Sequence, residues 1–302
     1  MKAIKISLAV IVVAALAFFV IRSCVATDKV GEIKSSGNQS IDKIQQEIKA
    51  LQQKPENKFC KDYYNEVAYH IDDYHKNNRL GKSTLENDQW KESLSKQLYA
   101  AYADKFIKQA YYIFNRSDWA GNDLSFIRKE YRALQSSPML ERDNPVDRRF
   151  NEIKMIFNKY DEIAGFISSC KGFSFSQTDL NMPFPLDEVK NKISVANSYR
   201  NNRLGNTYVN NCTRLYNELK EIPQVLFRAH VKYLDNMISY WSNNFSNFNS
   251  QKAYVSSLYS PLESKIDELD NDIYNVSDFS SEYDRLKGKW QDDGTRAYNH
   301  FN

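Results

Sequence analysis

The 302-residue chain is poor in the two residues that most often interrupt regular structure, with only 9 Gly and 7 Pro. A sandwich or barrel of many short strands needs turns at frequent intervals, and those turns rely on Gly and Pro. The shortage therefore excludes an all-β fold of that kind. It also leaves little material for Gly-rich phosphate loops, and no GxSxG, GxGxxG or Walker sequence occurs.

The sequence also lacks any long run of Lys and Arg, and its formal net charge is only +3. Nucleic acid is therefore not an expected partner. No HExxH or paired Cys and His spacing occurs, and Glu66, His70 and Asp73, which share one helix face, are expected to form a solvated helix edge. We expect no metal, no cofactor and no catalytic motif. A catalytic site assembled from distant residues would leave no motif, so enzymatic activity stays open.

One long uncharged run stands out in this otherwise polar chain. Residues 6–21 carry no charge, follow Lys2 and Lys5, and end at Arg22. Sixteen helical residues span about 24 Å, slightly less than a hydrocarbon core of about 30 Å, which the flanking charges bridge by snorkelling. The charge before the run exceeds the charge just after it, so the N-terminus is expected to stay inside and the bulk to be exported.

Three fates of this segment are compatible with the residues. An uncleaved anchor over 1–25 fits the length of the run and the charge that closes it. Cleavage after Ala26 fits the small residues Cys24 and Ala26. Lipid attachment at Cys24 fits the sequence of residues 21–24, which resembles a bacterial lipobox, although Arg22 stands where that motif has a small or apolar residue.

Residues 26–55 form a connector with one short amphipathic helix. Ser40 is its expected N-cap, and its apolar residues alternate at spacings of three and four. These residues are Ile41, Ile44, Ile48 and Leu51. Two heptads allow either self-association as a coiled coil or packing on the chain's own domain.

Beyond Pro55 the apolar residues recur at helical spacing almost to the C-terminus, which predicts an all-α fold. The expected helices span 57–79, 83–114, a segment from Asn122 stopped by Pro138, 144–170, 186–203, 207–221, 223–243, 251–274 and 278–290. Residues 171–185, with one Gly and two Pro, separate a first helical unit (56–170) from a second (186–302).

A short internal repeat supports two tandem related units. The sequence Asn-Asn-Arg-Leu-Gly at 77–81 recurs at 201–205, an offset of 124 residues. We expect Gly81 and Gly205 to be left-handed residues after a helix, and Ser83 and Thr207 to cap the next helix. The alternative is that the arginines of the repeat, at positions 79 and 203, bind a ligand.

Aromatic residues are abundant, with 20 Tyr, 17 Phe and 4 Trp. They fill helix cores in one interpretation and form platforms for a glycan or peptide in the other. Trp119 and Trp241 lie near the ends of equivalent helices in the proposed repeat, and they are the candidate ligand platform.

Export would place Cys60, Cys170 and Cys212 in an oxidising compartment. If the first four helices run up, down, up and down, Cys60 and Cys170 lie at the same end of the bundle. The sequence therefore predicts a Cys60–Cys170 disulfide, with three unpaired core cysteines as the alternative.

Together these features predict a non-enzymatic, membrane-anchored binding or scaffold protein of the bacterial envelope. Its main domain is expected in the periplasm, held in the inner membrane by the N-terminal segment and contacting other envelope proteins. A composition rich in Lys, Asn, Ile and Tyr fits an AT-rich bacterial genome. The alternative function is an envelope glycan-binding protein or hydrolase with a groove between the two helical units.

Overall fold

The structure is a computed structural model that describes residues 40–56, 60–78, 84–117, 119, 121–141, 144–175, 184–244, 261–270, 274 and 279–300. Every regular element in these ranges is a helix, so the expected all-α fold is confirmed. The hydrophobic segment of residues 6–21 lies outside the described residues. Within them, no helix combines the length and the apolar character needed to cross a membrane.

The helix bounds follow the sequence prediction closely in the first half of the chain. The longer helices are α2 (Ile41–Gln53), α3 (Lys61–Asn78), α4 (Thr84–Phe114), α5 (Asn122–Gln135), α6 (Pro145–Lys171), α7 (Leu186–Asn201), α8 (Thr213–Asn244) and α10 (Ser280–His300). Two 3₁₀ turns, η1 (Arg203–Gly205) and η2 (Val209–Asn211), lie between α7 and α8, and η4 (Glu268–Asp270) follows the helical residues 261–267.

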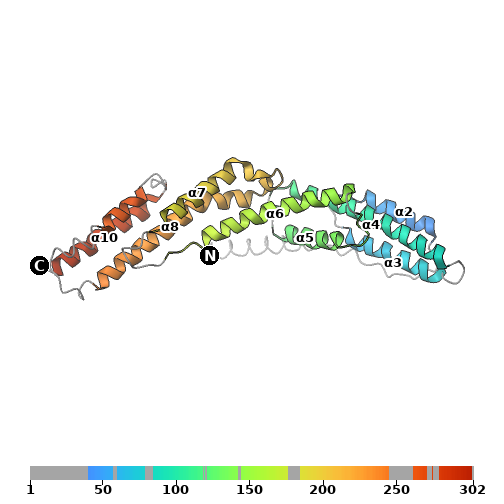
Figure 1. Cartoon of the computed structure of the whole chain (residues 1–302), viewed down its shortest axis with the longest axis horizontal. Coiled ribbons are helices and arrows are strands. Elements are labelled where there is room, and N and C mark those ends of the chain that lie inside the picture. The colour runs from blue at the N-terminus through green and yellow to red at the C-terminus, as the bar shows by residue number, and fades with distance from the viewer. Residues whose placement is uncertain are drawn as a thin grey trace, which may run out of the picture.

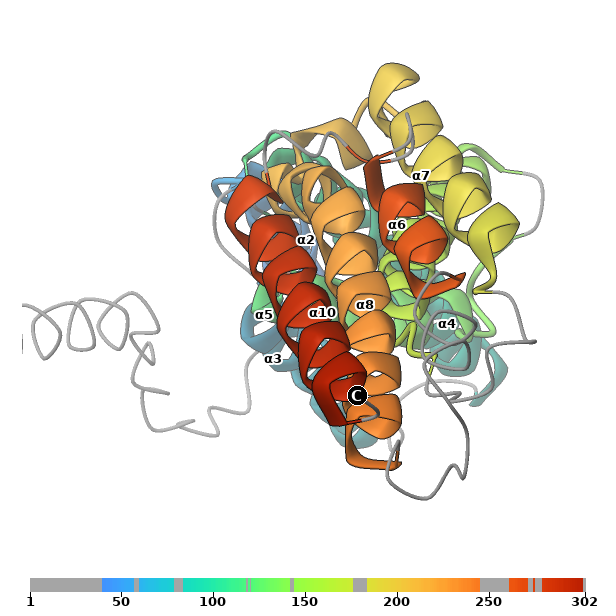
Figure 2. The ribbon, with the colours of Figure 1, turned by 90° about the vertical axis from the view of Figure 1, so that its left-hand side faces the viewer.

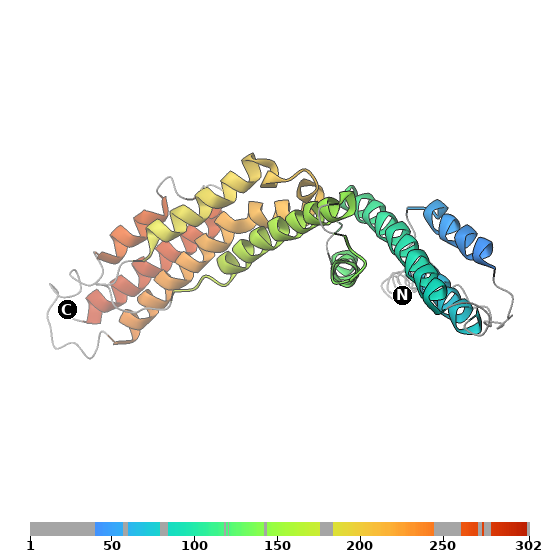
Figure 3. The same cartoon turned by 45° about the vertical axis from the view of Figure 1, so that its right-hand side comes forward.

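The helices form an elongated rod in which successive bundles overlap (Figure 1). Helix α4 packs against α2 and α3 and also against α5 and α6; α6 continues onto α8, which in turn contacts α7 and α10. Each of α4, α6 and α8 has between 27 and 32 residues, or roughly 40–50 Å of helix. The rod changes direction where α4 meets α6 (Figure 3), and its C-terminal end shows α10 lying beside α8 (Figure 2).

Local capping explains why two of these helices start where the sequence predicts. The Ser40 hydroxyl accepts a hydrogen bond from the Lys43 N–H, 3.2 Å away, at the start of α2. The Asn144 side chain accepts from the Asp147 N–H at 2.8 Å, and Pro145 occupies the first turn of α6, where no N–H is needed. The expected Ser40 cap is confirmed, and the Asn144 cap explains the start of α6.

The apolar stripe of α2 packs on the chain's own core. Ile44 and Leu51 have no exposed surface and Ile48 is 6% exposed, because α2 lies against α3 and α4. Ile41 is half-buried. In the structure the stripe thus has the second of the two arrangements that the sequence allows, packing on the chain's own domain.

Pro223 does not separate two helices, in contrast to the expected break between 207–221 and 223–243. It lies inside the single helix α8, which begins only at Thr213. A proline inside a helix removes a backbone hydrogen bond and costs about 3 kcal/mol. Burial on both sides offsets this cost, since Leu219 and Ile222 before it and Leu226 after it are fully buried.

The second copy of the repeated pentapeptide has the expected left-handed glycine, but in a different setting. Gly205 has φ +68° and closes η1, while the left-handed conformation already begins at Arg203 (φ +46°) and Leu204 (φ +55°). Thr207 is not a helix cap. The Asn206 carboxamide instead accepts from the Tyr208 and Val209 N–H groups, and α8 starts four residues after Val209. Gly81 and Ser83 of the first copy lie outside the described residues.

Candidate functional site

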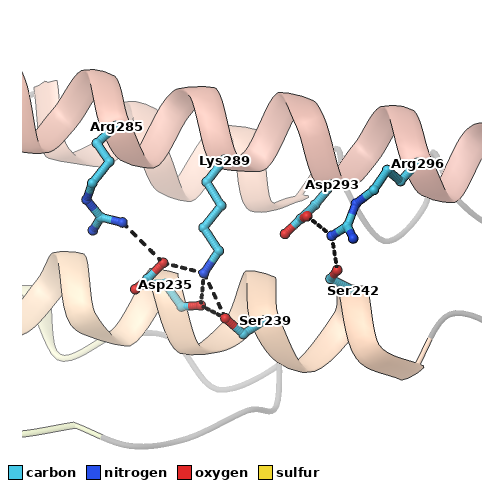
Figure 4. Close-up of polar contacts among 7 residues, drawn as sticks. All are labelled: Asp235, Ser239, Ser242, Arg285, Lys289, Asp293 and Arg296. Atoms are coloured by element: carbon cyan, nitrogen blue, oxygen red, sulfur yellow. Dashed lines mark hydrogen bonds and ion pairs between the residues drawn. The ribbon is translucent and has the colours of Figure 1, made fainter.

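A group of polar side chains joins the C-terminal half of α8 to α10 (Figure 4). It consists of Asp235, Ser239 and Ser242 on α8 and of Arg285, Lys289, Asp293 and Arg296 on α10. The three α8 residues follow one another at spacings of four and three, so they line one face of the helix. We call this set the α8–α10 seam.

Asp235 is the centre of the seam. The Lys289 Nζ lies 2.5 Å from the Asp235 Oδ1 and donates to the Ser239 hydroxyl at 2.8 Å. The Arg285 Nη1 lies 3.7 Å from the same carboxylate oxygen. One turn further along, Arg296 pairs with the buried Asp293 and donates to the Ser242 hydroxyl at 2.7 Å.

These contacts fix the position of α10 along α8 and do not resemble a catalytic set. A serine nucleophile needs a neighbouring base, whereas the Ser239 hydroxyl donates to the Asp235 main-chain carbonyl at 2.8 Å. The two carboxylates of the seam are each engaged by cations, Asp235 by Arg285 and Lys289 and Asp293 by Arg296. The seam therefore supplies register and cohesion between two helices.

The described histidines and carboxylates do not gather into a metal-binding group. His70 Nδ1 lies 2.8 Å from the Glu47 Oε2 and so joins α3 to α2. His75 Nε2 lies 2.7 Å from the Asp88 Oδ1 and joins α3 to α4. The expected solvated edge around His70 is thus an interhelical contact, because α2 folds back along α3.

The structure does not form the predicted aromatic platform from Trp119 and Trp241. Trp119 has no exposed surface, packs against Phe114 at 4.9 Å and Tyr160 at 5.4 Å between ring centres, and is a core residue. Trp241 is half-buried, edge-on to Tyr240, near the opposite end of α8. A helix of this length separates the two rings, so they cannot share a ligand.

The predicted Cys60–Cys170 bridge is not formed either, since all three described cysteines are buried thiols. Cys60 lies at the start of α3, where its Sγ accepts from the Gln109 amide of α4 at 3.9 Å. Cys170 lies at the end of α6, where burial raises the pKa of its thiol and the charge of Lys192 on α7 partly opposes that rise. The reason is that α6 runs past the first bundle and ends against the second half of the chain.

A buried histidine that the sequence did not single out lies in the second half. His230 has no exposed surface and stacks on Phe184, with 3.8 Å between ring centres and 6° between the planes. Neither ring nitrogen has a hydrogen-bond partner among the described residues. Burial, assisted by the charge of Lys265, lowers the pKa of His230 to about 3. Only tertiary packing brings its neighbours together.

Two surface cavities with basic linings differ in how their charges are balanced. One of about 400 Å³ lies between α4 and α6, and its cations are paired with acids: Lys108 and Arg149 with Asp104, and Arg116 with Asp123. Another of about 390 Å³ lies where α7, η1 and η2 meet α8, and we call it the α7–α8 cavity. Its two arginines, Arg200 and Arg203, form no ion pair with a described residue, and no acid lines it.

Sequence reasoning found Arg203 only through the pentapeptide repeat, and it gave no signal for Arg200 as a neighbour of α8 residues. The remaining lining of the α7–α8 cavity comes from residues 204–216, which the sequence assigned to a cap and the next helix.

Comparison with known proteins adds no function to this geometry: the chain matches no protein family, no curated protein and no solved structure.

Proposed function

We propose that this protein is a non-enzymatic, membrane-anchored binding or scaffold protein of the bacterial envelope, with its helical rod in the periplasm. The observation that carries the proposal is the sharing of α4, α6 and α8 between successive bundles. Because each long helix packs in two neighbouring bundles, bending the rod would disrupt packing in the middle of a helix. The rod is therefore suited to act as a stiff spacer with long side faces for partner helices.

The membrane part of the proposal rests on the sequence of residues 1–25. Their uncharged run and flanking charges favour an anchor in the inner membrane, with a cleaved, secreted form and a lipoprotein attached through Cys24 as the alternatives. An anchor at the N-terminus would attach the rod through the end formed by α2, α3 and α4, and it would leave α10 as the far end.

We also propose that the units 56–170 and 186–302 are related in tandem. Moving α3 by the repeat offset of 124 residues gives 185–202, and α7 spans Leu186–Asn201, one residue shorter at each end. Both helices pack against the long helix that follows them. Duplication of such a unit would lengthen the rod, because each added unit packs against the last helix of the unit before it.

A hydrolase receives no support from the described cavities. A glycoside hydrolase needs two carboxyl groups that flank the scissile bond. The cavity between α4 and α6 contains Glu56 as its only acid, and a third cavity of about 530 Å³ beside α2 contains only Asp104. The α7–α8 cavity contains none.

Two measurements on the full chain in cells test the proposal. Protease added to spheroplasts should degrade the rod, whereas intact cells should protect it. That pattern would place the rod in the periplasm, and protection in both samples would contradict export.

A photo-crosslinking amino acid at Leu85 or Met155, which are 69% and 65% exposed, should give discrete adducts with envelope proteins. The same label at the buried Leu98 is the control. Recovery of uncrosslinked protein at both exposed positions would contradict a scaffold role.

A further inference from the structure

The wall of the α7–α8 cavity includes backbone in a conformation that costs energy. Arg203 and Leu204 are the two non-glycine residues with positive φ among the described residues. A left-handed L-residue costs about 1–2 kcal/mol, and such costs concentrate at binding sites, where the surrounding structure holds them in place. Here Leu204 is 1% exposed, so its buried side chain holds the turn.

The turn is also fixed from the other side, by the end of α4. The Asn211 amide donates to the Phe114 carbonyl at 2.9 Å, and the Trp119 indole donates to the Tyr208 carbonyl at 3.0 Å. The 3₁₀ turns therefore sit on a rigid support. A cavity whose lining is already ordered loses little conformational entropy when a ligand binds.

The charge in the cavity is one-sided. Arg200 and Arg203 line it without a carboxylate among the described residues, whereas Arg214 nearby is paired with Glu218 at 2.7 Å and Lys159 with Glu162 at 2.8 Å. Arg200 has only a weak bond of 3.3 Å to Asn197 and a position over the Tyr216 ring, 5.6 Å from its centre. Guanidinium groups that have no carboxylate partner favour a ligand with a carboxylate or a phosphate.

Two further polar atoms in the lining lack partners. The Nε of Arg200 and the Oδ1 of Asn210 are buried and make no hydrogen bond with a described residue. One is a donor and the other an acceptor, and both reach the cavity only after their side chains rotate. A ligand that satisfies both must then offer an acceptor and a donor. Thr207 adds a hydroxyl, and Tyr216, which is 42% exposed, adds an aromatic ring.

From this combination we infer that the α7–α8 cavity binds an acidic sugar, a saccharide that carries a carboxylate or a phosphate. The arginines bind the acidic group, the Asn210 carbonyl oxygen accepts from a sugar hydroxyl after a small rotation of its side chain, and the Tyr216 ring packs on the sugar face. Arg200 also lies in the last turn of α7, where a cation offsets the helix dipole. That role does not explain the strained Arg203 or the unpaired Asn210. The inference does not depend on the scaffold proposal.

Isothermal titration of the full chain in detergent with four small molecules and one acidic peptide tests the inference. Glucuronate and glucose 6-phosphate should bind in the millimolar range, at least tenfold more tightly than glucose and inorganic phosphate. Glucose binding as tightly as glucuronate would show that the arginines contribute nothing. Phosphate binding as tightly as glucose 6-phosphate would indicate a simple anion site and overturn the sugar assignment. Tighter binding of an acidic peptide, or no binding of either acidic sugar, would also overturn it.

Three variants locate the site. Arg203→Gln should weaken glucuronate binding at least tenfold and leave the thermal midpoint unchanged, since the side chain is exposed. Asn210→Ala should weaken glucuronate several-fold and leave the weak phosphate signal unaltered, because only the sugar hydroxyl needs the amide. Arg148→Gln, an exposed arginine on α6, is the matched control and should bind as the unmodified chain does. Equal loss in Arg148→Gln and Arg203→Gln would reduce the effect to net charge and overturn the assignment.

Discussion

The indole N–H of Trp119 donates to the carbonyl oxygen of Tyr208, 3.0 Å away, although 89 residues separate them in the chain. The bond joins the segment after α4 to the turns before α8. Together with the bond from Asn211 to the Phe114 carbonyl, it ties the first half of the rod to the second. The junction is therefore a packed, hydrogen-bonded part of the core.

Replacing Trp119 tests this junction. Trp119→Phe removes the hydrogen bond and part of a fully buried side chain, so we expect the free energy of unfolding to fall by about 2 kcal/mol. Urea denaturation followed by circular dichroism measures it. Trp241→Phe, at a half-buried position, should cost less than half as much; equal effects would contradict the assigned role of Trp119.

The buried His230 predicts a loss of stability in acid. Its pKa is about 3 in the folded chain, compared with about 6.5 when unfolded, so between these values the unfolded state binds the extra proton. Stability is thus unaffected by this group above about pH 6.5. It falls as the pH drops from 6.5 toward 3, by about 5 kcal/mol in total.

The variant His230→Phe isolates that contribution. Phenylalanine keeps a flat ring against Phe184 and cannot take up a proton, so its stability should decline less steeply between pH 6.5 and 4 than that of the unmodified chain. Urea midpoints at four pH values give the two slopes. Identical slopes would show that His230 does not remain neutral and buried.

The α8–α10 seam predicts a measurable coupling between two residues. Asp235→Asn and Lys289→Met should each destabilise α10, and the double variant should be less destabilised than the sum of the two. The expected coupling is about 1 kcal/mol, because both groups remain partly exposed. Hydrogen exchange of the amides in α10 reports it. A coupling near zero would mean that apolar contacts alone hold α10.

Relieving the strain at Arg203 should stabilise the chain. Glycine adopts φ +46° without the steric cost that arginine has, so Arg203→Gly should raise the free energy of unfolding by about 1 kcal/mol. Arg203→Gln keeps the strain and should leave it unchanged. Destabilisation by glycine in urea melts would contradict a left-handed residue at this position.

The three described cysteines should remain thiols in the folded protein. Their neighbours differ, with Cys60 beside α4 and Cys170 beside α7, so no bridge between them is expected. Alkylation in denaturant without reductant, followed by peptide mapping, should modify Cys60, Cys170 and Cys212. A linked Cys60–Cys170 peptide would show that the two halves pack differently from the structure.

The all-α class and the bounds of most helices could be predicted from the sequence, because these depend on local signals. Helix α5 begins at Asn122 as expected, and α6 begins at Pro145 behind its Asn144 cap, since capping and apolar spacing act within a few residues of the chain. Prediction from local signals was wrong at Pro223. There the burial of apolar residues before and after the proline outweighs its propensity to end a helix.

How far each helix extends into the next bundle depends on tertiary packing, and the candidate sites depend on that extent. The predicted disulfide assumed that four helices close one bundle, whereas α6 continues past it onto α8. Three other features likewise depend on residues from different elements. They are the burial of Trp119, the burial that keeps His230 neutral, and the lining of one cavity by both Arg200 and Asn210. Such contacts arise from the packing of whole helices, for which a single sequence carries no local signal.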